Sequence, residues 1–167
     1  MKLLKTIQFN NLTPEEIEDF EVREAARAVV FDEDKNVALL YVAKYNRHKL
    51  PGGGVEEHEG VEEALYRECL EEIGCQVEKF AEVGEIVEYR DKWSLEQHSY
   101  CFLAKVIGAK GEPNFTPEEK VNGFEIKWVS FEEAIELLKQ DDPEDYEGKF
   151  IKIRDAIFLK EAYEIIT

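Results

Sequence analysis

The chain has 167 residues, of which 44% are hydrophobic and 35% are charged, and its 38 Asp and Glu against 21 Lys and Arg give a formal net charge of −17. This composition is typical of one globular domain over residues 1–167 and excludes an intrinsically disordered chain. The acidic balance argues against nucleic acid or an anionic membrane as partner, because either would be approached against a repulsive field.

The N-terminal part of the chain predicts a strand, a short helix and a hairpin. The strand is expected near Lys2–Phe9, and the segment Thr13-Pro14-Glu15-Glu16 has the form of a capping box with proline at the first helical position. The β-rich stretches Glu24–Phe31 and Val37–Ala43 flank a polar, turn-forming cluster. They predict a β-hairpin.

The middle of the chain predicts one helix followed by three strands. The helix spans Val61–Ile73 and ends at Gly74, because glycine readily adopts the positive φ of that position. Two strands are expected over Val77–Tyr89 and His98–Ile107, and a last one over Phe124–Val129. Together with the hairpin they predict a mixed sheet.

Two further helices are expected near the C-terminus. One follows the capping box that begins at Ser130, and the other begins at about Gly148, after an acidic loop. The residues expected to face the core are Phe131, Ile135 and Leu138 in the first, and Phe150, Ile153 and Ile157 in the second. Helices before and after a run of strands predict an α/β fold with a mixed sheet covered on both faces.

The cysteines and the N-terminal residues indicate where in the cell the protein is expected. Cys69, Cys75 and Cys101 are odd in number and lack C-x-x-C spacing, so neither a disulfide framework nor a zinc site is expected. A reducing cytoplasm is the simplest location. The first residues turn polar before a signal peptide could form, and no apolar run is long enough to span a bilayer, so neither export nor membrane anchoring is expected.

The most informative segment runs from Gly53 to Cys75 and reads G-x5-E-x7-R-E-C-x-E-E-x-G-C. On a helix, this spacing places Glu68, Glu71 and Glu72 on one face, directly behind a Pro-Gly-Gly-Gly loop. Three neighbouring carboxylates repel one another, so a bound cation would resolve the repulsion. Oxygen ligands favour Mg²⁺ or Mn²⁺.

A run of glutamates is more often a solvated helix face than a metal site. However, the Gly, Arg and Gly at fixed positions among the glutamates make an accidental match rare, about a few in a thousand over the whole chain. A functional site is therefore the better interpretation. The opposite side of the helix, with Leu65, Cys69 and Ile73, is expected to face the core.

The segment resembles the Nudix box, the signature of the Nudix hydrolases, and every fixed position of that box is present. Cys69 and Cys75 stand where the family usually has aliphatic residues, and reduced cysteines pack in a similar way. The resemblance extends over about Arg23–Leu138. It implies an α/β/α sandwich and hydrolysis of a nucleoside diphosphate linked to another group, by attack of water on phosphorus at a Mg²⁺ or Mn²⁺ site.

The resemblance also implies roles for the residues of the box. Glu68, Glu71 and Glu72 correspond to metal ligands with a direct part in catalysis, and the carbonyl of Gly52 completes the coordination. Glu59 and Arg67 correspond to an ion pair that holds the loop and the catalytic helix in register. An Arg in such a bidentate contact is poorly replaced by Lys.

The general base stays open, because some Nudix hydrolases use a glutamate of the box and others one on a later loop. Here the later candidates are Glu118 and Glu119. Thr116-Pro117-Glu118-Glu119 is itself a capping box, so capping and catalysis are competing interpretations for Glu119.

Residues around the box are candidates for substrate contacts. Arg47 and Lys49 are expected to contact phosphate, and Gly53 and Gly54 to let the backbone approach it closely. One or two of five aromatic residues are expected to stack on a base: Tyr45, Tyr89, Trp93, Phe115 and Phe124. The single histidines His48, His58 and His98 are expected to be neither nucleophiles nor zinc ligands.

The expected partner is a small-molecule nucleotide. The proline that ADP-ribose hydrolases usually carry shortly after the box is absent between Pro51 and Pro113, which favours a nucleoside triphosphate or a broad range of nucleotides. The alternative is a catalytically silent Nudix-fold nucleotide-binding or regulatory protein, although the intact box argues against it. A purely structural acidic protein would leave the glycine loop unexplained. A homodimer, common among Nudix hydrolases, stays open.

Overall fold

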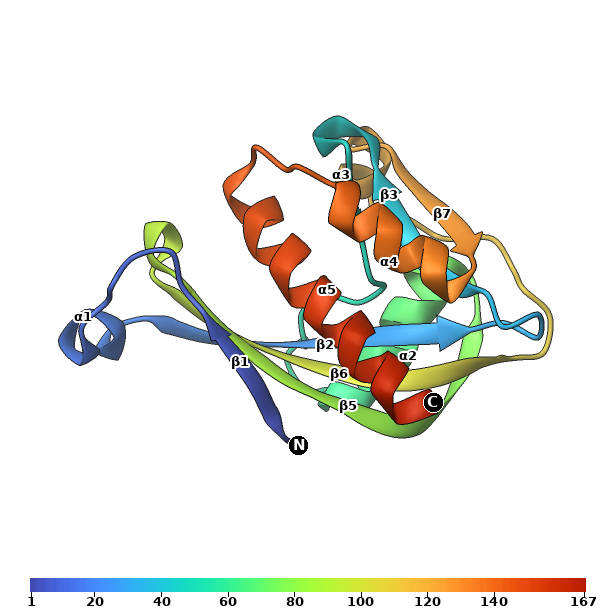
Figure 1. Cartoon of the computed structure of the whole chain (residues 1–167), viewed down its shortest axis with the longest axis horizontal. Helices are drawn as coiled ribbons and strands as arrows, with labels where there is room; N and C mark the ends of the chain where they lie inside the picture. Colours follow the sequence, from blue (N-terminus) through green and yellow to red (C-terminus); the bar gives the residue numbers. More distant parts are fainter.

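A seven-stranded mixed β-sheet runs through the computed structural model, which describes residues 1–167 (Figure 1). Its strands are ordered β1-β5-β6-β2-β3-β4, and β7 pairs with β3. They are β1 (Leu3–Ile7), β2 (Glu21–Phe31), β3 (Val37–Val42), β4 (Arg47–Lys49), β5 (Gln76–Arg90), β6 (Leu95–Ile107) and β7 (Phe124–Val129). The β1–β5 and β2–β6 pairs are parallel and the others antiparallel.

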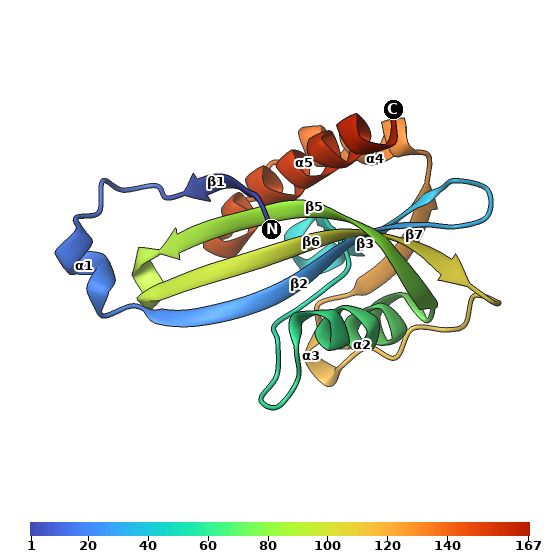
Figure 2. The same cartoon turned by 90° about the horizontal axis from the view of Figure 1, so that it is seen from below.

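Helices cover both faces of this sheet. The helices are α1 (Pro14–Glu18), α2 (Val61–Ile73), α3 (Pro117–Val121), α4 (Phe131–Gln140) and α5 (Tyr146–Ile166), with 3₁₀ turns at Ala43–Tyr45 and Asp91–Trp93. Helices α4 and α5 lie on one face and α2 on the other (Figure 2). The predicted α/β/α sandwich is therefore confirmed.

The two layers of core follow from alternation along the strands. Val29 and Leu39 point to one face, where they pack with Phe158 of α5, while their neighbours Ala28 and Leu40 belong to the core against α2. All of these side chains are fully buried. Leu65, Cys69 and Ile73 face the core against α2, as predicted.

Several local predictions are confirmed. Helix α2 and strand β7 have the predicted bounds, and Gly74 ends α2 in the left-handed conformation at φ 66°. Thr13 and Thr116 each form the reciprocal capping box. At α4, the Ser130 hydroxyl accepts a hydrogen bond from the Glu133 amide, which is one half of the predicted box.

Three predictions were wrong in part. The predicted hairpin is paired only at Phe31 and Val37, because β2 instead runs parallel to β6 along its whole length. Helix α5 begins at Tyr146, two residues earlier than expected, since Asp145 caps it. Ile153 is exposed, because the core face of α5 is completed by the buried ion pair of Arg154 and Asp155 rather than by a continuous apolar stripe.

The short strand β4 was not predicted, because its sequence Arg-His-Lys carries no apolar pattern. His48 of this strand is buried and held by Asp141, whose carboxylate accepts from the His48 amide at 2.7 Å and lies 2.9 Å from Nδ1. The role of this histidine is therefore structural. The three cysteines are buried and unpaired.

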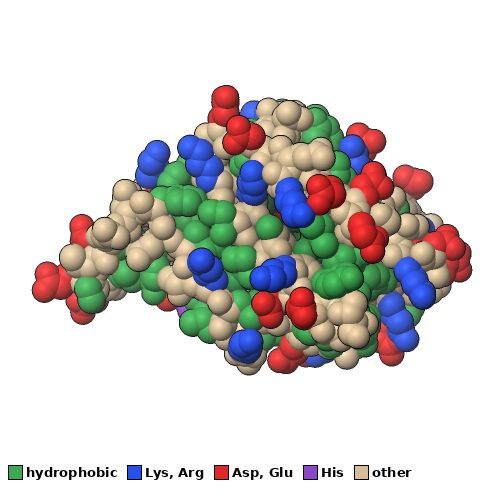
Figure 3. Space-filling model, in the orientation of Figure 1, with side chains coloured by type: hydrophobic (Ala, Val, Ile, Leu, Met, Phe, Trp, Pro, Cys, Tyr) green, Lys and Arg blue, Asp and Glu red, His purple; other side chains and the backbone are tan.

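On the face that carries α4 and α5, Lys and Arg side chains are interspersed with Asp and Glu, so this side of the molecule is not uniformly acidic (Figure 3). The long strands β2, β5 and β6 extend beyond the helices and carry α1 at their far end (Figure 1). None of the helices combines the length and apolar character needed to cross a membrane.

His98 of β6 provides a test of the sheet. Its ring nitrogens lie 2.6 Å from a Glu85 carboxylate oxygen and 2.7 Å from one of Glu96. Partial burial acts to lower the pKa of His98, but the two carboxylates outweigh it and raise the pKa above its ordinary value. A raised pKa stabilises the fold below the unfolded value of about 6.5, and this stabilisation is lost as pH rises through the folded value.

We therefore expect His98→Gln to destabilise the protein most near about pH 6, with the difference shrinking toward about pH 9. Urea unfolding of both proteins across this range measures the difference in free energy. A difference that does not vary with pH would show that His98 is not charged in the fold.

Candidate active site

The loop between β4 and α2 is hydrogen-bonded to β2, to α5 and, through the Gly52 amide, to α2 itself. Its backbone pairs with β2, where the amides of Ala26 and Ala28 donate to the carbonyls of Gly53 and Pro51 at 2.9 and 3.1 Å. From α5, the buried Asp155 accepts a hydrogen bond from the Leu50 amide at 2.8 Å. The loop is thereby held in one conformation.

Gly52 is the tightest point of this loop. Its φ of 131° lies in the region that favours glycine, and an added Cβ would collide with the backbone of β2. Its amide donates to Glu72 at 2.7 Å, and its carbonyl accepts from Arg27 and, at 3.1 Å, from the Lys49 ammonium. The carbonyl predicted to bind metal is therefore already directed at cationic side chains.

Arg67 joins this loop to helix α2, as predicted. Its guanidinium donates to both carboxylate oxygens of Glu59 at 2.6 and 3.1 Å, to the Gly54 carbonyl at 3.0 Å, and to Glu68 and Glu71 at 2.8 and 3.3 Å. The hydrogen bonds from Arg67 keep the pKa of Glu59 below its ordinary value. In turn, the Glu59 carboxylate raises the pKa of Arg67.

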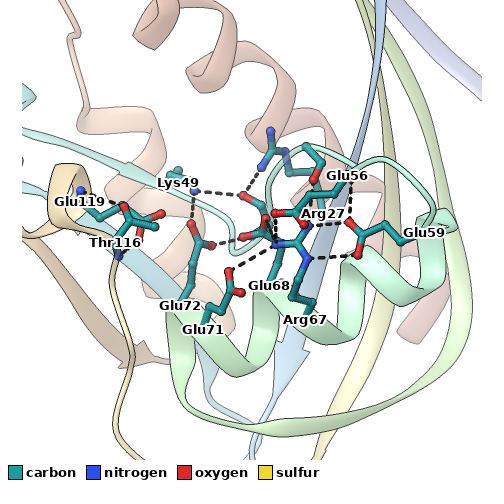
Figure 4. A network of polar contacts seen from close by, with 12 residues as sticks. Arg27, Lys49, Glu56, Glu59, Arg67, Glu68, Glu71, Glu72, Thr116 and Glu119 are labelled. Carbon is teal, nitrogen blue, oxygen red and sulfur yellow. Dashed lines mark hydrogen bonds and ion pairs between the residues drawn. The ribbon is translucent and has the colours of Figure 1, made fainter.

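The three glutamates of the box lie side by side on α2 in different environments (Figure 4). Glu68 and Glu72 are buried and Glu71 is half-buried. Burial raises the pKa of Glu72 although the Lys49 ammonium, 2.7 Å away, opposes it. Burial also raises the pKa of Glu71, against the effect of Arg67.

The structure corrects one premise of the sequence prediction. The repulsion among the carboxylates is resolved by the chain's own cations, since Arg67 bonds to Glu68 and Glu71 while Lys49 bonds to Glu72. With these ion pairs in place, no three His, Cys, Asp or Glu side chains are grouped closely enough to hold a metal ion. Each of the three carboxylates therefore has a cationic partner within the chain.

The chemistry of the donors nevertheless fits a hard dication. Glu68, Glu71, Glu72 and the Gly52 carbonyl offer only oxygen atoms, which is the ligand set of Mg²⁺ and Mn²⁺. Gly53 provides the space for one of them, because a Cβ at that position would overlap the Glu68 carboxylate. The glycine of the box thus leaves room for a carboxylate as well as for a ligand.

A cleft of about 400 Å³ opens beside these groups. Among the predicted residues, its walls include Arg47, Lys49, Glu68, Glu72 and the three loop glycines Gly52, Gly53 and Gly54. Arg67 and Glu71 are not part of the lining; they lie alongside Glu68. The structure thus brings the predicted phosphate-binding side chains and two of the three acidic side chains to one cavity.

Glu119 both caps α3 and lines this cleft. Its carboxylate accepts from the Thr116 amide at 2.8 Å, and its own amide donates to the Thr116 hydroxyl at 3.2 Å. It lies across the cleft from Lys49 (Figure 4). Glu118 is more exposed and also lines the cleft. The two interpretations of Glu119 are therefore compatible.

The structure separates the aromatic candidates. Tyr45 and Phe124 line the cleft, and Phe115 packs against Phe124 with ring centroids 5.7 Å apart. The other two lie outside it, since Tyr89 packs against Phe20 and Trp93 against Tyr146. Of the five aromatic candidates, Tyr45 and Phe124 are thus the two that line the cleft.

Sequence reasoning missed several polar residues of the cleft. Arg27 is buried and bonds to the Gly52 carbonyl, and burial together with the nearby Arg154 lowers the pKa of Arg27 to about 10. Its position in the sequence, as the one charged residue in the apolar second half of β2, could have indicated a buried functional arginine. Arg23 and Gln97 sit opposite each other in the β2–β6 register and also line the cleft.

The comparisons with known proteins agree with this geometry. The family model of the NUDIX domain matches residues 21–149. This chain belongs to the Nudix family. One similar solved structure is a MutT protein from Methanosarcina mazei Go1, which is 19% identical with a TM-score of 0.58; the match covers 89% of this chain and 99% of that chain. Another is the Ap4A hydrolase of C. elegans, which is 16% identical with a TM-score of 0.59; the match covers 88% of this chain and 100% of that chain. These likenesses show the shared fold.

Three similar Nudix sequences have names that refer to the family or to its chemistry. A Bacillus subtilis (strain 168) protein provisionally named an 8-oxo-dGTP diphosphatase is 32% identical over 64% of this chain and 66% of its own length. Nudix hydrolase 13, mitochondrial, of Arabidopsis thaliana is 28% identical over 73% and 63%. An RNA pyrophosphohydrolase of Teredinibacter turnerae is 31% identical over 62% and 54%. The matches thus span about two thirds of these relatives or less.

The Arg67 contacts predict a large effect of a conservative change. We expect Arg67→Lys to lower the free energy of unfolding by about 1–3 kcal/mol, because an ammonium cannot reproduce the bidentate contact with Glu59 together with the bond to Gly54. Urea unfolding measures this change. In the control Arg23→Lys, at an exposed arginine, the change should stay within about 0.5 kcal/mol. Equal changes in the two variants would contradict the conclusion that the Arg67 contacts with Glu59 and Gly54 stabilise the fold.

Proposed function

We propose that this Nudix protein is a single-domain, metal-dependent hydrolase that cleaves a phosphoanhydride bond in a small nucleoside diphosphate-linked molecule, with nucleoside triphosphates as the preferred class. One observation carries the proposal: the acidic end of α2 and the cationic side chains Arg23, Arg27, Arg47 and Lys49 line one cleft. The same lining holds five glutamates, Glu68, Glu72, Glu118, Glu119 and Glu147. The four cations together with a divalent metal ion would therefore supply the positive charge that a polyanion needs.

The residues divide this work by position. Glu68, Glu71, Glu72 and the Gly52 carbonyl would hold Mg²⁺ or Mn²⁺, which when bound neutralises phosphate oxygens and lowers the pKa of coordinated water. Arg47 and Lys49 would contact the phosphates. Because the loop is already bound to β2, α2 and α5, the Gly53 and Gly54 backbone is positioned before substrate arrives.

The names of the relatives support cleavage of a phosphoanhydride bond, but they do not agree on a single substrate. They include an 8-oxo-dGTP diphosphatase and an RNA pyrophosphohydrolase, and both names refer to phosphoanhydride compounds. In this chain Tyr45 and Phe124 would stack on the base. The acidity of the whole chain disfavours long RNA, so we propose free nucleotides. The buried, unpaired cysteines support a cytoplasmic location.

We expect the protein to release phosphate or pyrophosphate from at least one member of a panel of nucleoside triphosphates, dinucleoside polyphosphates, nucleotide sugars, ADP-ribose and 5′-triphosphorylated RNA, with Mg²⁺ or Mn²⁺. Glu72→Gln should reduce the rate by more than about 100-fold, since replacement of even outer-sphere partners of a metal costs 10–100-fold. Glu62→Gln, on the same helix but exposed and paired with Lys79, is the matched control. No turnover of any compound would favour a silent nucleotide-binding protein.

Replacing Glu119 by Gln separates capping from catalysis, because Gln can still form the capping box. If Glu119 is the general base, Glu119→Gln should reduce kcat by about 10²–10⁴-fold and leave KM nearly unchanged. Steady-state kinetics of this variant and of Glu118→Gln provide the comparison. Normal turnover in Glu119→Gln would exclude Glu119 as the base, and a loss in Glu118→Gln would assign the role to Glu118.

A further inference from the structure

The Lys49 side chain bonds to two of the oxygens that the proposed function assigns to the metal. Its Nζ lies 2.7 Å from Glu72 Oε1 and 3.1 Å from the Gly52 carbonyl oxygen (Figure 4). Both residues of the ion pair are buried, with 10% of the Lys49 side chain and 2% of the Glu72 side chain exposed. The ammonium is therefore the counter-charge that a buried carboxylate needs.

Lys49 differs from Arg67, the cation that pairs with Glu68 and Glu71, in how firmly it is held. Arg67 is fixed by Glu59 and by the Gly54 carbonyl, in addition to the catalytic glutamates, and it does not line the cleft. Lys49 does line the cleft, carries a flexible four-carbon stem, and uses two of its three donors on Glu72 and Gly52. It is the cation that can move without releasing the loop.

We propose that Lys49 is an exchangeable internal counter-ion, which shields Glu72 and the Gly52 carbonyl until a divalent cation takes these oxygens, and which then turns to the phosphates of the substrate. The inference rests on the proposed metal site. An ammonium and a dication repel each other and cannot both bond to the same two oxygens. Metal and polyphosphate should therefore bind with positive coupling, each favouring the Lys49 position that the other requires.

This exchange predicts opposite effects of one substitution on two ligands. In Lys49→Gln and Lys49→Met, Mn²⁺ alone should bind about tenfold tighter than in the wild type, because the competing ammonium is gone. At saturating Mn²⁺, imidodiphosphate should bind about tenfold weaker, because a phosphate contact is lost. Electron paramagnetic resonance measures free Mn²⁺, and calorimetry measures imidodiphosphate binding. Lys49→Gln keeps a hydrogen-bond donor for Glu72, so the test can still be made with this variant if Lys49→Met does not fold.

Lys44→Gln is the matched control, because it removes the same charge from an exposed position a few residues away. An equal gain in Mn²⁺ affinity in Lys44→Gln would mean that overall charge is responsible, and would overturn the exchange. Unchanged Mn²⁺ affinity in both Lys49 variants would also overturn it while leaving the proposed metal site intact. If no protein binds Mn²⁺, both the metal site and the exchange are refuted.

Discussion

The structure depends on how one turn of α2 accommodates three glutamates beside a glycine loop. Buried carboxylates are tolerated only when they are paired and hydrogen-bonded. Here Arg67 bonds to Glu68 and Glu71, and Lys49 bonds to Glu72. These ion pairs let an acidic helix pack against the sheet without an ion. A metal ion that binds these glutamates must therefore compete with Arg67 and Lys49, which already bond to them.

The glycine loop is positioned by residues distant from it in the sequence. Asp155 of α5 holds the Leu50 amide, Arg27 of β2 holds the Gly52 carbonyl, and Glu72 of α2 holds the Gly52 amide. Each anchor comes from a different layer of the sandwich. The C-terminal helix therefore contributes to the candidate site by holding the loop, and the position of the loop is a property of the whole fold.

The cleft gathers cationic side chains beside five glutamates, Glu68, Glu72, Glu118, Glu119 and Glu147. Four arginine and lysine side chains line it although the chain as a whole is strongly acidic. The net charge of the whole chain repels large polyanions at long range. Arg47 is itself paired with Asp145 at 3.3 Å, which limits its free charge and directs the guanidinium along the wall.

The sequence by itself determined the features that depend on neighbouring residues. The bounds of α2, the stop at Gly74 and the Thr13 and Thr116 caps arise from spacings within one segment, where local hydrogen-bond geometry decides the outcome. The Arg67–Glu59 pair was implied by the resemblance to the Nudix box, and the structure contains it. Tertiary structure alone decided the pairing of β2 with β6, the strand β4, and the contacts of Arg27 and Asp155 with the loop. Leu50 and Asp155 are 105 positions apart, and no periodicity reveals that a charge inside a helix will meet a loop amide once α5 folds over the sheet.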